Sequence, residues 1–65
     1  MTAQIIAKQS IFVALLLSNG FYGVGEFNDE THQITKLFHN DLPTEQLAVD
    51  IVAVKHILFT VHGIQ

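Results

Sequence analysis

The sequence predicts an all-α protein, a small three-helix hairpin or bundle that is completed by homodimerisation, because its last segment is apolar on two sides. Two further observations support this fold class: three segments show helical spacing or helix-capping residues, and the connections between them are only a few residues long. Sixty-five residues make one small domain, so we expect residues 1–65 to fold as a single α-helical unit.

The first predicted helix covers residues 2–18. Its interior contains no glycine or proline, and Asn19-Gly20 supplies residues that tolerate the left-handed conformation at which many helices end. The polar side of its first half becomes apolar at Ile11 and Leu15. We therefore expect the second half of this helix to be buried on several sides.

A glycine-rich loop is predicted at residues 20–27, with a short hairpin or an extended segment as the alternative. Three glycines interrupt regular structure here, beside several aromatic and apolar side chains. Aromatic side chains of this kind often anchor protein interfaces, although they could instead plug the end of the bundle. The predicted contacts to a partner protein are Phe21, Tyr22, Val24 and Phe27.

A second helix is predicted at residues 28–40. Asn28 can accept hydrogen bonds from the free N–H groups of a helix start, and the two acids that follow it favour the positive end of a helix. Basic side chains line one side of this helix. If the protein binds a small anionic ligand or nucleotide at a dimer interface, the predicted contacts are His32, Lys36 and His39.

The third predicted helix covers residues 43–62. Pro43 suits a first helical turn because its missing N–H would be unpaired anyway, and Gly63 can end the helix. One apolar side steps by four, three, four and three residues, and we expect it to pack on the rest of the chain. Its members are Leu47, Ile51, Val54, Leu58 and Val61.

The second apolar side of this helix needs another molecule to cover it, most simply a second copy of the chain. We predict that it forms a homodimer together with two residues of the first helix; the alternative is that this side docks a target helix or covers a groove of another protein. The predicted self-association residues are Ile11, Leu15, Ala48, Val52 and Phe59. On this assignment, Val52→Asp should dissociate the dimer, or unfold the chain if folding and association are coupled, whereas Val54→Asp should unfold the subunit outright.

The composition favours association over a free monomer. Hydrophobic residues make up 49% of the chain and charged residues only 14%, against roughly 25% charged residues in average proteins. A chain this short is marginally stable, and without cysteines it cannot use disulfides, so oligomerisation is the expected reinforcement. Three dispersed lysines, no arginine and a formal charge of -3 argue against direct nucleic-acid binding.

No motif in the sequence indicates catalysis. The histidine spacings do not place two imidazoles one turn apart, and neither serine lies in a Gly-x-Ser-x-Gly setting. We therefore expect no enzyme, no metal site and no cofactor. Without signs of a disulfide-bonded, secreted fold, we expect a cytoplasmic location. A membrane-associated small protein is an alternative, but the apolar run at residues 11–17 is too short to span a bilayer.

The sequence as a whole predicts a non-enzymatic protein-binding module. Its partners would be a second copy of itself and another protein whose surface it occupies, in the manner of an adaptor or inhibitor. Small, acidic, cysteine-free chains of this type are plausible accessory proteins of phages or mobile elements.

Overall fold

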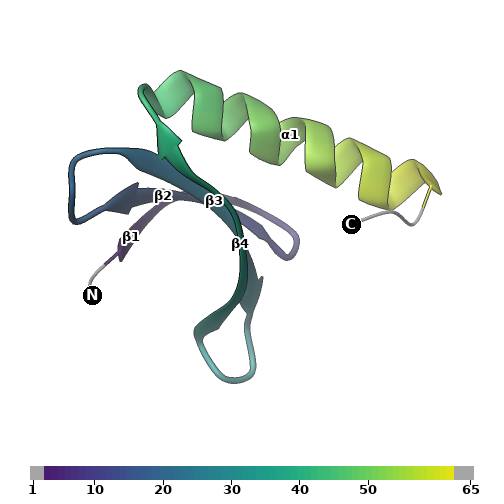
Figure 1. Ribbon diagram of the computed structural model, residues 1–65. Helices are drawn as coiled ribbons and strands as arrows, with labels where there is room; N and C mark the ends of the chain where they lie inside the picture. The colour runs from purple at the N-terminus through teal and green to yellow at the C-terminus, as the bar shows by residue number, and fades with distance from the viewer. Residues whose placement is uncertain (1–2, 63–65) are drawn as a thin grey trace.

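The computed structural model describes residues 3–62 and shows a four-stranded antiparallel sheet with one helix packed across one face (Figure 1). Each strand pairs with the next in sequence, so the sheet order is β1-β2-β3-β4 and the edge strands are β1 and β4. The molecule measures 33 × 26 × 15 Å. The elements are β1 (Ala3–Gln9), β2 (Phe12–Leu17), β3 (Tyr22–Asn28), β4 (Gln33–Leu42) and α1 (Glu45–His62).

The all-α prediction is wrong, beginning with the predicted helix 2–18: its residues 3–17 form the β1–β2 hairpin, and residue 2 lies outside the described residues. The chain reverses at Ser10, whose φ is +57°. Strand β2 is central and apolar on both sides, because α1 covers one face and β4 curls towards the other. A short continuous apolar run fits such a strand as well as it fits a buried helix.

The predicted helix 28–40 is also wrong, because this segment forms the β3–β4 turn and β4. Asn28 does accept hydrogen bonds from backbone N–H groups, those of Glu30 at 2.8 Å and Thr31 at 3.3 Å. It caps a turn, however, and not a helix. The turn closes at His32, whose φ is +57°. Most of the predicted loop 20–27 is extended in β3, as the alternative reading of that segment expected.

Helix α1 corresponds to the third predicted helix, 43–62, and starts two residues later. Thr44 precedes it, and the Leu47 N–H donates to Thr44 Oγ1 at 3.3 Å. Pro43 lies just before this cap, where it removes no helical hydrogen bond.

The core lies between α1 and the sheet. Its five fully buried members come from two central strands and the helix: Phe12, Ala14, Val24, Ala48 and Val52. The Phe12 ring is central, because it meets Phe59 edge-on at 5.7 Å between centroids and Phe38 at 6.3 Å. The helix is thereby held on the sheet by aromatic as well as aliphatic contacts.

The open face is the name we give to the sheet face opposite α1. Strand β4 curls over part of this face. Two glycines of β3 permit this close approach: a Cβ atom on Gly23 would lie 2.6 Å from the carbonyl oxygen of His39, and one on Gly25 would lie 2.7 Å from that of Lys36. Shifts in the β3–β4 register accompany the curl. A second buried cluster forms on this face: Val13, Leu15 and Leu17, with Ala3 and Phe27 packed against them.

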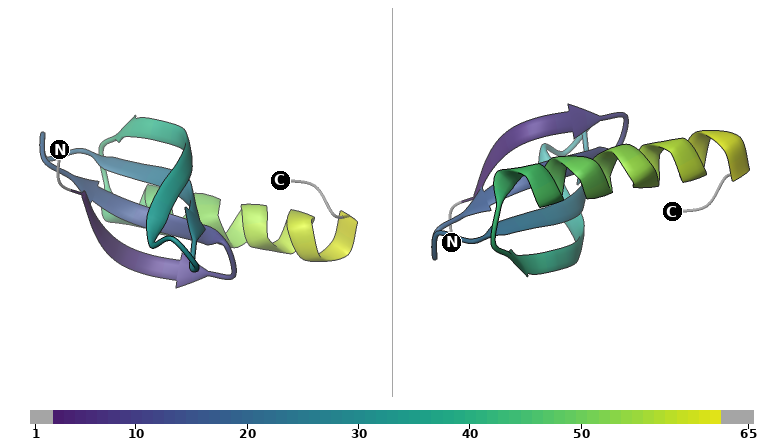
Figure 2. Two further views of the ribbon diagram at one scale, coloured as in Figure 1. Left: turned by 90° about the horizontal axis from the view of Figure 1, so that it is seen from below. Right: turned by 90° about the horizontal axis from the view of Figure 1, so that it is seen from above.

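Helix α1 crosses the sheet diagonally, and its C-terminal turns extend past the sheet edge (Figure 2). The exposure of its apolar side chains agrees with this overhang. Ile57 and Val61, near the end of the helix, are 58% and 67% exposed.

Candidate protein-binding surfaces

The four aromatic and apolar residues predicted to contact a partner do not form one surface. Phe21 is exposed in the β2–β3 turn, but Val24 is fully buried beneath α1. Tyr22 is half-buried on the same side as Val24, whereas Phe27 packs on the open face. Of the four, Phe21 is the one exposed side chain, at 46%.

The five residues predicted for self-association lie in the interior of a single subunit. Ala48 and Val52 are fully buried against the sheet, and Phe59 packs on Phe12. Ile11 is half-buried at the same core, and Leu15 is buried on the open face. The two sides of α1 therefore have the opposite roles to those expected: the side assigned to the dimer faces the sheet.

The other side of α1, assigned to the subunit core, is mostly exposed, although its member Ile51 packs against the core at the sheet. We call its members the outer stripe: Leu47, Ile51, Val54, Leu58 and Val61. Ile51 is half-buried, and the other four are between 40% and 67% exposed. Ile57 adds a further exposed apolar side chain beside the stripe. The helix thus has two apolar sides, as the sequence indicated, and one of them is uncovered in the subunit.

The predicted ligand contacts do not line a common cavity. His32 stacks on Phe27 at 6.4 Å between ring centroids, in the β3–β4 turn. Lys36 Nζ lies 5.8 Å from the centroid of the Phe38 ring, and His39 is half-buried on β4. Within residues 3–62, no group of three histidine, aspartate or glutamate side chains is placed to hold a metal ion.

The open face contains an apolar hollow that the sequence reasoning missed, here called the sheet groove. Leu15 and Leu17 of β2 form its floor, and Ile34 and Leu37 of β4 form one wall. Strand β1 borders the opposite side, where Ile5 is paired with Leu15 and is 38% exposed. A cavity of about 280 Å³ lies in this groove, lined by Ala3, Leu15, Leu17, Ile34, Thr35, Lys36 and Leu37.

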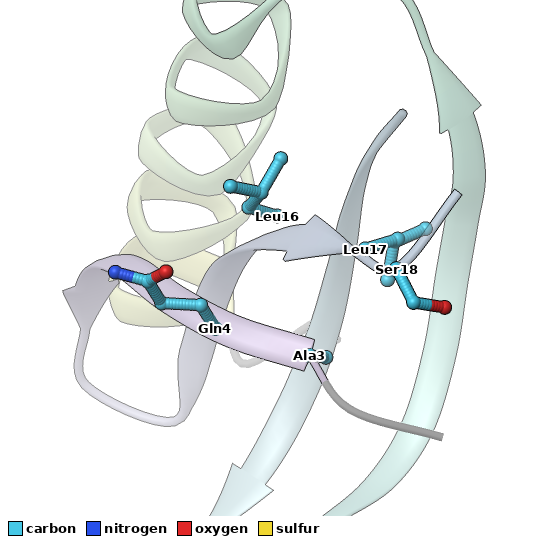
Figure 3. A pocket seen from close by; sticks show the side chains of 5 residues that line it. All are labelled: Ala3, Gln4, Leu16, Leu17 and Ser18. Carbon is cyan, nitrogen blue, oxygen red and sulfur yellow. The ribbon is translucent and has the colours of Figure 1, made fainter. Parts of the chain in front are cut away.

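The groove is bounded at one end and open at the other. The Lys8 ammonium, near the end of β1, lies 3.2 Å from Asp29 Oδ1 in the β3–β4 turn, which ties the two hairpins together. At the opposite end, a further hollow lies where β1 begins and β2 finishes (Figure 3). There, Leu16 points to the α1 side of the sheet, and Leu17 points towards β4.

The chemistry that this groove offers is apolar contact and backbone pairing. Its floor and walls are aliphatic, and Lys36 is the one charged side chain among the described residues that line its cavity. Because β1 and β4 are the two sheet edges, the groove lies between strands that each have one side unpaired within residues 3–62.

Two polar side-chain atoms, Glu26 Oε2 and His56 Nδ1, are buried without a hydrogen-bond partner among the described residues. They belong to β3 and α1, and neither residue lines the groove cavity. In the part of the chain that the structure describes, no helix is both long and apolar enough to cross a membrane. No protein-family model, curated protein or solved structure matches this chain.

Proposed function

We propose that this protein is a non-enzymatic protein-binding module, an adaptor or inhibitor, that binds an extended apolar segment of a partner protein in the sheet groove. The sheet groove is the observation that supports this function best, because it combines an aliphatic floor with a strand edge on each side. The proposal includes a cytoplasmic location, which the cysteine-free sequence led us to expect.

The proposed occupant is extended because of the strands that flank the groove. A segment lying beside β1 would donate and accept backbone hydrogen bonds as an added strand. Every second side chain of that segment would then point towards Leu15 and Leu17, since side chains alternate along a strand. Closure of the other end by the Lys8–Asp29 ion pair favours entry from the end near Leu37.

A small anionic ligand has less support than a peptide. Sites for drug-sized ligands usually enclose about 300–1,000 Å³, and the groove cavity of about 280 Å³ is open and lies just below that range. Its lining includes Lys36 but neither His32 nor His39. An apolar chain that pairs along its backbone matches this lining better than a phosphate or carboxylate does.

The experiment that tests this function is selection of short random peptides displayed on phage against the purified protein. We expect enriched peptides to carry apolar residues at alternating positions. Synthetic versions, titrated as soluble monovalent ligands, should shift the amide signals of Leu15, Leu17 and Leu37 in NMR spectra. Shifts confined to α1, or no enrichment of alternating sequences, would contradict the proposal.

A matched pair of variants sharpens this test. Leu37 in the groove and Leu47 on α1 are each 43% exposed. Leu37→Asp should weaken peptide binding by at least about tenfold, because it places a charge where the peptide must be desolvated. Leu47→Asp should leave the affinity within about twofold of the wild-type value. If Leu47→Asp weakens peptide binding and Leu37→Asp does not, the peptide binds α1 and not the groove.

A further inference from the structure

We infer that α1 pairs in parallel with α1 of a second copy of this chain along the outer stripe, with Asp50 of each copy opposite Lys55 of the other. This inference concerns the uncovered side of the helix and is independent of the sheet groove. The contacts of α1 with the core at the sheet are made by Ala48, Val49, Ile51, Val52 and Phe59, so of the outer stripe only Ile51 also packs on the core. Pairing along the outer stripe therefore leaves the groove of each copy accessible.

The spacing of the outer stripe is that of a helix–helix seam. Its steps of four, three, four and three residues average 3.5, the repeat that keeps apolar side chains aligned along a neighbouring helix. A helix whose one role is to cover a sheet is expected to carry polar side chains on the side that faces away from the sheet. The stripe extends from Leu47 to Val61, about 21 Å along the helix at 1.5 Å per residue.

The position of two charges selects a parallel pair. When the stripe occupies the a and d positions of a heptad, Asp50 falls at g and Lys55 at e. In a parallel pair, a g residue lies opposite the e residue five positions further along the other helix, so Asp50 meets Lys55 of the second copy. The two-fold axis repeats this ion pair. An antiparallel pair would place e opposite e and g opposite g, which leaves both charges without this partner.

Each charged group has one contact within its own subunit and retains capacity for a second. Lys55 Nζ lies 4.0 Å from the centroid of the Phe38 ring, which occupies one side of the ammonium. The one ion pair among the described residues joins Lys8 and Asp29, so Lys55 is paired with no carboxylate of residues 3–62. Asp50 accepts one hydrogen bond, from Gln46 Nε2 at 2.8 Å to Oδ1. Its Oδ2 can accept an ammonium donor from outside.

A second copy of this chain is a better partner for the outer stripe than an unrelated helix. It carries the same apolar stripe, and its Asp50 and Lys55 are complementary to Lys55 and Asp50 of the first copy. Two heptads are too short to pair as isolated peptides, since each would first have to become helical. Here α1 is already held on the sheet by the Phe12 and Phe59 rings. Pairing two such helices orders side chains only, which lowers the entropic cost of association.

The first test is the mass of the full chain in solution, measured by sedimentation equilibrium. We expect a dimer at about 100 μM. Val54→Asp should raise the dissociation constant at least about 100-fold, while the circular dichroism spectrum keeps its folded form. Leu37→Asp, in the groove, is the matched control and should remain dimeric. A wild-type monomer at this concentration, or a Val54→Asp dimer, would overturn the inference.

Charge reversal then tests the register. Asp50→Lys and Lys55→Glu should each raise the dissociation constant about tenfold, because each creates two like-charge contacts. An equimolar mixture of the two variants should recover wild-type affinity as a heterodimer, since both of its contacts again join opposite charges. A mixture that associates no better than either variant alone would refute this register.

Disulfide trapping gives a second, independent measure of direction. The natural chain has no cysteine. In a parallel pair, Leu47→Cys should form a disulfide with its own equivalent in the second copy, and Val61→Cys should do the same. Cross-linking that occurs only when the two variants are mixed would show an antiparallel pair. If the variants form a folded dimer but no disulfide, alone or mixed, the interface does not lie along the outer stripe.

Discussion

The carbonyl oxygen of His39 lies 2.6 Å from the point that a Cβ atom on Gly23 would occupy. The backbones of β3 and β4 can approach this closely only because Gly23 has no side chain on the open face. The contact brings β4 over that face, where Ile34 and Leu37 become a wall of the sheet groove. A single glycine thus connects the local register of two strands to the surface on which the proposed function depends.

Gly23→Ala should destabilise the protein by roughly 2 kcal/mol, as measured by urea denaturation. The obstructing atom belongs to the backbone of β4, so the clash can be relieved only by moving the strand. Gly20→Asn is the control, because no atom lies within 4 Å of a Cβ at that position, although φ is +88°. Asparagine tolerates positive φ, so the control should lose less than about 1 kcal/mol. Equal losses in both variants would show that the close approach is unimportant.

Val52→Asp should unfold the subunit and Val54→Asp should leave it folded, which for Val54 reverses the expectation from the sequence pattern. Val52 is fully buried between α1 and the sheet, so an aspartate there should unfold the subunit. Val54 is 55% exposed, so Val54→Asp should change the unfolding free energy of the isolated subunit by less than about 1 kcal/mol. Circular dichroism on dilute, monomeric samples measures both. A folded Val52→Asp variant would contradict this packing of the helix.

The helix could be predicted from the sequence because its signals are local. Pro43 and Thr44 mark its start, and apolar residues recur at helical spacing through Val61. The spacing showed that two sides are apolar, but it could not show which one meets the sheet. That choice depends on tertiary contacts, such as that of Phe59 with Phe12, which no local pattern contains.

The sheet was missed because its central strand has no alternating pattern. Residues 12–17 are apolar throughout, since β2 is covered on both faces, and such a run resembles a buried helix. One local signal did point to a hairpin: Asn19-Gly20 between two apolar runs is a frequent turn sequence. The sheet groove could not be predicted, because Leu15 and Leu37 are brought together only by the curl of β4.

Thr44→Ala should lower the unfolding free energy by about 1 kcal/mol, because it removes the side-chain acceptor at the start of α1. The Leu47 N–H, which donates to Thr44 Oγ1 at 3.3 Å, would lose its partner. Thr44→Ser keeps a hydroxyl in the same place and should retain most of the stability in urea denaturation. If serine costs as much as alanine, the hydroxyl does not act as a cap.

Asn28→Ala should also destabilise the protein by about 1 kcal/mol, through the β3–β4 turn. The Asn28 side-chain oxygen accepts from the N–H groups of Glu30 and Thr31. Asn28→Asp keeps an acceptor at this position and should cost less than the alanine variant in thermal unfolding. A larger loss for aspartate would mean that the amide nitrogen, and not the oxygen, holds the turn.

The ion pair that closes one end of the sheet groove should be weak. Lys8 and Asp29 side chains are 39% and 64% exposed, so solvent and salt screen their attraction. A double-mutant cycle with Lys8→Met and Asp29→Asn should give a coupling energy below about 1 kcal/mol, falling further at high salt. A coupling that exceeds this and persists in salt would show a rigidly closed end.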